Sequence, residues 1–66
     1  MSEWLIRSSY REGDFIEHQY FVGGEEIEVI SEKSLPEEVN AKTNEHSLKL
    51  NKNSKLGSTL ESTVKI

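Results

Sequence analysis

The feature that most constrains the fold of this chain is a pair of glycines between two strand-like runs. Gly23 and Gly24 separate residues 15–22 from residues 25–33, and both runs contain aromatic or β-branched side chains. A two-residue glycine loop between such runs is typical of a tight β-hairpin. The hairpin predicts three cross-strand pairs: Val22 with Glu25, Tyr20 with Ile27, and His18 with Val29.

A further strand is predicted over residues 3–10, where side-chain character alternates. Residues 11–14 read as a turn, with Gly13 in the left-handed conformation of a three-residue loop. That loop predicts five pairs: Tyr10 with Asp14, Ser8 with Ile16, Ile6 with His18, Trp4 with Tyr20, and Arg7 with Glu17. The two turns agree in parity, which means that both place the same alternate residues on one side of the sheet. They predict one apolar face with these residues: Trp4, Ile6, Tyr10, Ile16, Tyr20, Val22, Ile27 and Val29.

The opposite face of this three-stranded meander, residues 1–33, is predicted to be acidic with a few large apolar side chains. Its apolar members are Leu5, Phe15, Phe21 and Ile30, and its polar members are Arg7, Glu17, Gln19, Glu26, Glu28 and Glu32. A three-stranded sheet cannot bury both of its faces alone. We therefore expect the remainder of the chain to cover the apolar face.

Residues 34–42 predict a short helix, because Pro36 suits the first helical position and two acids follow it. Asn44 is expected to end this helix. Residues 43–66 form a segment rich in Lys, Asn, Ser and Thr, with one or two strands and room for disorder. Within it we expect a strand over residues 47–50, a turn over 51–55 and a strand over 59–66, although the spacing of Leu56, Leu60 and Val64 also fits a helix face.

Together these elements predict a mainly β fold over residues 1–66, with one short helix after the third strand. The expected architecture is a single small domain with four to five strands, either an antiparallel sheet or an SH3-like barrel. A chain of 66 residues leaves room for one core. It contains no cysteine, which excludes disulfides and zinc–thiolate sites. No signal peptide and no apolar run of membrane-spanning length is present, so we expect a cytoplasmic protein.

No constellation in the sequence predicts catalysis or a metal site. His18 and His46 are far apart in the chain and have no cysteine partner. The hydroxyl residues lie in no Gly-x-Ser-x-Gly turn, and no Lys-Ser/Thr pair follows Gly24 as in a phosphate-binding loop. We therefore expect no enzyme, no cofactor and no metal, and a His18 that is partly buried and titrates near neutral pH.

The charges are distributed unevenly along the chain. Residues 1–41 carry ten acids against Arg7, Arg11 and Lys33, whereas residues 42–66 carry five lysines against Glu45 and Glu61. An acidic face with apolar anchors suits docking on a basic surface. We expect a small protein-binding module, a regulator or inhibitor, with these binding residues: Phe15, Glu17, Phe21, Glu26, Glu28, Ile30 and Glu32. The competing interpretation is an ordinary solvated face whose apolar residues are covered by the C-terminal half.

Two other functional hypotheses remain open. A nucleic-acid-binding β-barrel would use Lys49, Lys52 and Lys55 for phosphate contacts and strand aromatics for base stacking, although the aromatic half is acidic. A homodimer would form through an exposed strand edge.

One short stretch carries a family resemblance. Residues 35–39, Leu-Pro-Glu-Glu-Val after Val29 and Ile30, look like a segment of phage uracil-DNA glycosylase inhibitors, which are small acidic β-proteins. The resemblance implies a DNA mimic that blocks a DNA-binding enzyme. Ser31, Glu32 and Lys33 stand where that family has a Glu-Ser-Ile element that enters the enzyme cleft. The likeness covers five contiguous residues, and we assign no family from it.

Overall fold

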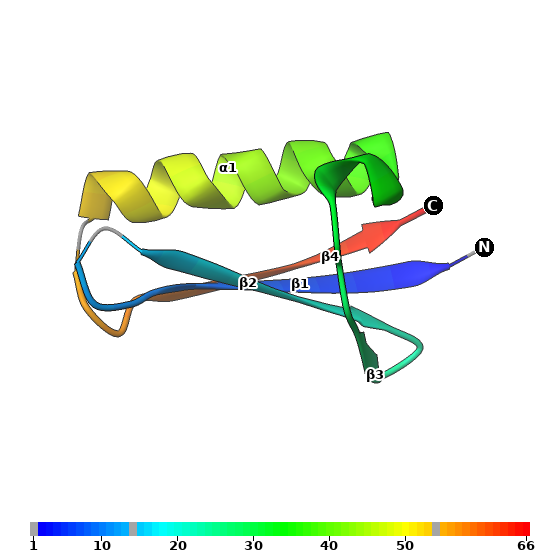
Figure 1. The fold of residues 1–66 in the computed structure, drawn as a ribbon, viewed down its shortest axis with the longest axis horizontal. Coiled ribbons are helices and arrows are strands. Elements are labelled where there is room, and N and C mark those ends of the chain that lie inside the picture. Colours follow the sequence, from blue (N-terminus) through cyan, green and yellow to red (C-terminus); the bar gives the residue numbers. More distant parts are fainter. Residues whose placement is uncertain (1, 14, 54) are drawn as a thin grey trace.

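A computed structural model of the chain describes residues 2–13, 15–53 and 55–66. Figure 1 shows an antiparallel sheet with one long helix across one of its faces. The sheet has four strands in the order β3-β2-β1-β4: β1 (Glu3–Tyr10), β2 (Ile16–Val22), β3 (Glu25–Ile27) and β4 (Thr59–Lys65). A short 3-10 helix, η1 (Glu32–Ser34), and the helix α1 (Glu37–Asn53) lie between β3 and β4. The fold is therefore the small, mainly β arrangement predicted from the sequence, in the form of an open sheet.

The Gly23–Gly24 hairpin is confirmed in both turn and register. Both glycines have positive φ, 62° and 84°, as a primed two-residue turn requires. Val22 pairs with Glu25 and Tyr20 with Ile27. The predicted pair between His18 and Val29 is wrong, because β3 ends at Ile27 and the chain then leaves the sheet towards α1 (Figure 1).

The departure of the chain from β3 follows from core packing. Leu35 and Val39 are buried against Ile6 and Tyr20. A strand that continued to residue 33 in the plane of the sheet would hold Leu35 away from these partners. Burying an aliphatic side chain of this size is worth about 1.5–3 kcal/mol, which favours early departure from the sheet.

The β1–β2 register differs from the predicted one by two residues. Tyr10 pairs with Ile16, whereas the predicted partner, Asp14, lies outside the described residues. The other predicted pairs are also wrong, since the partners are Ser8 with His18, Ile6 with Tyr20, Trp4 with Val22, and Arg7 with Gln19. A two-residue shift leaves every side chain on its own face. The predicted apolar face therefore survives, with Ile6, Tyr10 and Tyr20 buried.

The helix is longer than predicted. It runs through Asn44 to Asn53, so the strand expected over residues 47–50 is wrong, and residues 51–53 are helical rather than part of a turn. Ser54, in that expected turn, lies outside the described residues. The two acids predicted for the first turn are confirmed as Glu37 and Glu38, although the helix begins at Glu37 rather than at Pro36.

The C-terminal strand is confirmed, and the helical alternative for that segment is wrong. Along β4 exposed residues alternate with half-buried ones, and Leu60, Ser62 and Val64 lie on the side of α1. The strand pairs with β1 and forms one edge of the sheet. Among the described residues, no helix has the length and apolar character needed to cross a bilayer.

Candidate functional site

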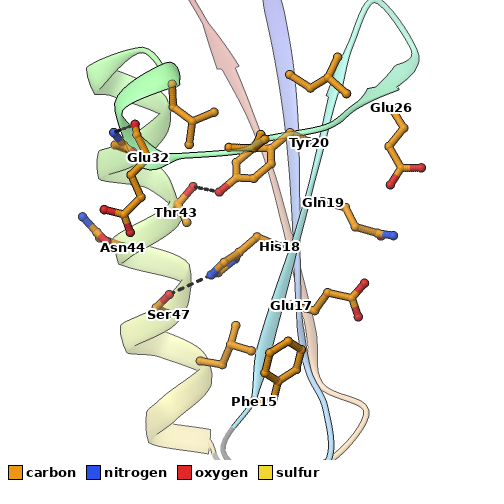
Figure 2. A pocket seen from close by; sticks show the side chains of 15 residues that line it. Phe15, Glu17, His18, Gln19, Tyr20, Glu26, Glu32, Thr43, Asn44 and Ser47 are labelled. Carbon is orange, nitrogen blue, oxygen red and sulfur yellow. Dashed lines mark hydrogen bonds between the residues drawn. The ribbon is translucent and has the colours of Figure 1, made fainter.

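A groove of about 400 Å³ opens between α1 and the outer edge of β2 (Figure 2). It exists because β3 pairs only with the second half of β2 and leaves residues 16–19 without a strand on that side. The apolar groups that line it include Ile16, Ile27, Val29 and Leu35. Its polar wall on α1 consists of Asn40, Thr43, Asn44 and Ser47.

Two hydrogen bonds between different elements, those of Tyr20 and Asn40, hold the walls of the groove in place at one end. The Tyr20 hydroxyl lies 3.0 Å from Thr43 Oγ1 (Figure 2), and Thr43 donates to the Val39 carbonyl oxygen at 3.0 Å. The Asn40 side chain donates to the Glu32 carbonyl oxygen at 2.8 Å. These bonds attach β2 and η1 to α1.

From the wall of the groove into the core, five side chains form a continuous hydrogen-bonded chain, which we call the polar network. Ser47 Oγ lies 3.2 Å from His18 Nε2, and His18 Nδ1 lies 2.7 Å from Ser8 Oγ. Ser8 Oγ is also 2.9 Å from His46 Nδ1, and His46 Nε2 is 2.9 Å from Ser62 Oγ. The polar network therefore joins α1 to three strands, β2, β1 and β4.

The polar network lies inside the core. Ser8 and His46 are completely buried, and His18 is half-buried as predicted. A buried polar group without a partner costs about 1–3 kcal/mol. Within the described residues, every buried side-chain nitrogen and oxygen has a hydrogen-bond partner. The network thus places polar groups in the core without leaving any of them unsatisfied.

The donors and acceptors of the network limit how many protons it holds. A neutral imidazole has one donor and one acceptor, and a hydroxyl has one donor. With both rings neutral, the bonds run in one direction from Ser47 to Ser62, or all in reverse. One added proton is accommodated, because Ser8 still accepts from one ring and donates to the other. A second proton would direct two N–H donors at Ser8 and leave the Ser8 hydrogen without an acceptor in the network.

Burial lowers the pKa of both histidines. For His18 the cause is loss of solvation. For His46 loss of solvation again lowers the pKa, the Glu45 carboxylate raises it, and the positive charges of His18, Lys42 and Lys49 lower it. Both rings are therefore neutral at neutral pH, a state in which every bond of the network can form.

The chemistry of this arrangement favours fixing the helix over activating a nucleophile. Ser47 and His18 have the composition of a nucleophile and base, but an efficient pair needs a third group that stabilises the imidazolium. Behind His18 stands the Ser8 hydroxyl. No carboxylate hydrogen-bonds to either ring in the described part of the chain. No cluster of three or more metal-binding side chains is found there either.

The second candidate surface is the sheet face opposite α1, which we call the open face. No described element covers it (Figure 1). Its central residues are Leu5, Arg7 and Phe21, which surround a hollow of about 390 Å³ beside the Gly23–Gly24 turn. The Arg7 guanidinium lies 5.4 Å from the centre of the Phe21 ring, and its Nε lies 2.6 Å from Glu61 Oε1.

Three of the predicted binding residues lie on the open face. Phe21 borders the hollow, and Glu17 and Glu26 point away from α1 (Figure 2). Glu17 forms an ion pair with Arg11 at 3.2 Å. Phe15 directly precedes β2 and is 63% exposed.

The remaining predicted residues do not join a continuous sheet face. Glu28 and Ile30 lie between β3 and η1, and Glu32 begins η1. They belong to a stretch that we call the acidic segment, residues 25–38, with these carboxylates: Glu25, Glu26, Glu28, Glu32, Glu37 and Glu38. Within the described residues none of these carboxylates forms an ion pair. Ile30, at 91% exposure, stands among them.

The lysines of the nucleic-acid hypothesis lie on and just after α1. Lys49 forms an ion pair with Glu45 at 3.0 Å, Lys52 lies in the last turn of α1, and Lys55 follows it. The cation–π contact found among the described residues belongs to Arg7 and Phe21 instead. These three lysines thus lie on the C-terminal part of α1 and in the segment after it, not on the strands of the sheet.

The polar network was missed from the sequence, although a signal was present. Ser8 and His18 share the parity of the predicted apolar face. On α1 the buried residues are Val39, His46 and Leu50, a spacing of one helical face. The signal in the sequence was therefore the pair Ser8 and His18 on a predicted apolar face, since polar residues at such positions indicate a hydrogen-bonded cluster in the core.

Comparisons with protein-family models, with curated proteins and with solved structures found no match for this chain.

Proposed function

We propose that this chain is a small non-enzymatic protein-binding module that docks on a basic partner surface through the open face. The observation that carries the proposal is the uncovered hollow at Leu5 and Phe21. Both side chains are only half-buried, and they lie on the two central strands, on the face that no described element covers (Figure 1). Buried aromatic anchors of this kind supply much of the affinity at protein interfaces.

Charge supports a basic partner. The acidic segment adjoins the open face at Glu26, and its carboxylates are not neutralised by ion pairs among the described residues. Such a field accelerates encounter with a positive surface and disfavours phosphate backbones. A role as a regulator or inhibitor follows if the covered partner surface is itself functional.

The test is capture of partners from an extract of the native cell by immobilised protein. Phe21→Ala combined with Glu28→Lys removes the anchor and reverses one charge of the acidic segment. A matched control, Leu48→Ala with Glu12→Lys, also truncates one large apolar side chain to alanine and reverses one charge, at exposed positions elsewhere. We expect the control to retain the wild-type partner and the first variant to lose it while its circular dichroism stays unchanged.

Capture at wild-type strength by the Phe21→Ala, Glu28→Lys variant contradicts the proposal. A second measurement separates it from nucleic-acid binding. The fluorescence of Trp4 is recorded during titration with single-stranded oligonucleotides at low salt. No response is expected, whereas binding that weakens steeply with added salt favours the nucleic-acid hypothesis.

A further inference from the structure

The first half of β2 is an unpaired strand edge beside a groove. β1 pairs with the whole of β2, but β3 pairs only with residues 20–22. Residues 16–19 therefore have a strand on one side only. The chain that could have continued β3 along them leaves the sheet after Ile27 and runs towards α1 (Figure 1).

The phase of the β1–β2 ladder shows which backbone groups face outward at this edge. The Arg11 amide donates to the Phe15 carbonyl oxygen at 2.8 Å. Bonding residues alternate along an antiparallel strand, so the odd-numbered residues of β2 bond to β1. The amide and carbonyl groups of Ile16 and His18 consequently point away from β1, towards the open side.

Sheet edges in natural proteins are usually protected by lysine, proline, bulges or a covering segment. Residues 16–19 contain neither lysine nor proline, and in the described structure no strand covers them. An edge of this kind is the acceptor for β-augmentation, in which an extended peptide adds one strand.

We propose that residues 16–19 of β2 bind an extended peptide of a partner protein in which apolar and basic residues alternate. The inference rests on the proposed function as a protein-binding module and names the segment that the partner inserts. The peptide forms a fifth strand and bonds to the backbone of Ile16 and His18.

Strand alternation then determines the side chains of the peptide. Residues opposite Ile16 and His18 point into the groove, where Ile27, Val29 and Leu35 provide apolar contacts. An aliphatic side chain such as valine suits these positions.

Peptide residues opposite Glu17 and Gln19 point to the other side, towards the open face. There they approach the carboxylates of Glu17 and Glu26, which both point away from α1 (Figure 2). The groove itself adds Glu32, and no lysine or arginine lines it within the described residues. Lysine or arginine in the peptide, opposite Glu17 and Gln19, therefore complements these carboxylates. The ion pair with Arg11 already neutralises part of the Glu17 charge.

The same charges argue against a second copy of this chain as the occupant. An antiparallel pair that uses Ile16 and His18 of both copies places Glu17 of one directly opposite Glu17 of the other. Like charges directly opposite each other on neighbouring strands are destabilising.

The experiment is an NMR titration of the ¹⁵N-labelled protein with a capped peptide in which valine and lysine alternate. We expect the amides of Ile16 and His18 to shift and to become protected from hydrogen exchange. A peptide with glutamate in place of lysine is expected to bind about tenfold more weakly, and a backbone N-methylated lysine peptide is expected not to protect these amides.

A charge reversal at the edge sharpens the test. Glu17→Lys is expected to lower affinity for the lysine peptide about tenfold and to raise it for the glutamate peptide, because a favourable cross-strand pair becomes a like-charge pair. Glu12→Lys, in the exposed loop, is the control with the same change of net charge.

Equal binding of both peptides to wild type, or shifts at Leu5 and Phe21 without shifts at Ile16 and His18, would overturn the edge proposal. The second pattern would leave the open face intact as a docking surface. Conversely, peptide binding at the edge together with unchanged partner capture by the Phe21→Ala, Glu28→Lys variant would contradict the open-face function alone. Concentration-dependent dimerisation that protects Ile16 and His18 without peptide would assign the edge to a second copy.

Discussion

The two faces of this sheet are formed by the same four strands, yet their polar side chains are in opposite environments, buried on one face and exposed on the other. The face under α1 holds Ser8, His18 and Ser62 in a hydrogen-bonded chain with His46 and Ser47 of the helix. The open face holds Arg7 and Glu61 as an exposed ion pair. Buried polar groups are neutral and fully hydrogen-bonded, because removing a charge or an unpaired polar group from water is costly. Exposed charged groups can bind water wherever they have no protein partner.

This difference predicts unequal contributions to folding. A buried network loses both packing and hydrogen bonds when one member is removed, because the remaining partners stay in the core. An exposed ion pair loses little, because water replaces each partner. The two faces should therefore be distinguished by the size of the destabilisation, and also by its response to pH and salt.

The largest effect is expected from His46→Ala. The substitution leaves a cavity at a completely buried position and removes partners of Ser8 and Ser62. We expect a loss of about 2–4 kcal/mol in the free energy of unfolding. Urea unfolding followed by circular dichroism measures it. Leu48→Ala on the same helix, at a position 65% exposed, is the control and should change stability by about 0.5 kcal/mol or less. Equal losses in the two variants would show that the network does not support the fold.

An intermediate effect is expected from acid. The pKa of each histidine is lowered in the folded state from the ordinary value of 6.5. As the pH falls below that value, the unfolded chain binds protons before the folded chain does, so the free energy of unfolding decreases. The stabilisation is present above the unfolded pKa and is lost as the pH falls to the folded pKa. Each unit of pKa difference corresponds to about 1.4 kcal/mol.

Urea unfolding between about pH 7.5 and pH 5.5 measures this loss, since carboxylates remain ionised over that range. Replacement of both histidines by glutamine removes the titrating groups and should flatten the profile. A wild-type stability that is constant over this range, or that rises as the pH falls, is the contrary result. Because the network holds one proton well and a second poorly, NMR titration should also resolve two separate steps.

The division of side chains between the two faces was predictable from the sequence, whereas the β1–β2 register was not. Two glycine-containing turns with agreeing parity were sufficient to assign Ile6 and Tyr20 to the covered face and Phe21 to the open face. The β1–β2 register was two residues off, because Gly13 alone does not determine where the residues around the turn begin to pair. A register error of two residues leaves each side chain on its predicted face, whereas an error of one residue moves it to the opposite face.

The helix beyond residue 42 was not predictable from hydrophobic periodicity. Its inward face carries the polar residues Thr43, His46 and Ser47 between Val39 and Leu50. Low exposure therefore recurs with the helical period of 3.6 residues, but apolar side chains do not. The prediction that Glu28 and Ile30 lie on a face of the sheet is wrong for a related reason. Core packing of Leu35 draws the chain out of the sheet after Ile27. Both errors arise where tertiary contacts override a local pattern.

The smallest effect is expected on the open face, from Arg7→Met. The substitution keeps much of the aliphatic stem but removes the ion pair with Glu61 and the contact with the Phe21 ring. Both Arg7 and Glu61 are well exposed, at 41% and 46% of their side chains. We expect a loss of about 0.5–1 kcal/mol in urea unfolding at low salt, and less at high salt because screening weakens the pair.

Arg11→Met is the matched control, because its longer and more exposed ion pair with Glu17 should contribute almost nothing. A loss in Arg7→Met as large as that in His46→Ala would contradict the contrast between the faces and would make the open face part of the folding core. With the expected small loss, the contacts of Arg7 contribute little to the fold. Its substitution can then change partner binding on the open face without unfolding the chain, and circular dichroism makes the same check for the Phe21→Ala, Glu28→Lys variant in the capture experiment.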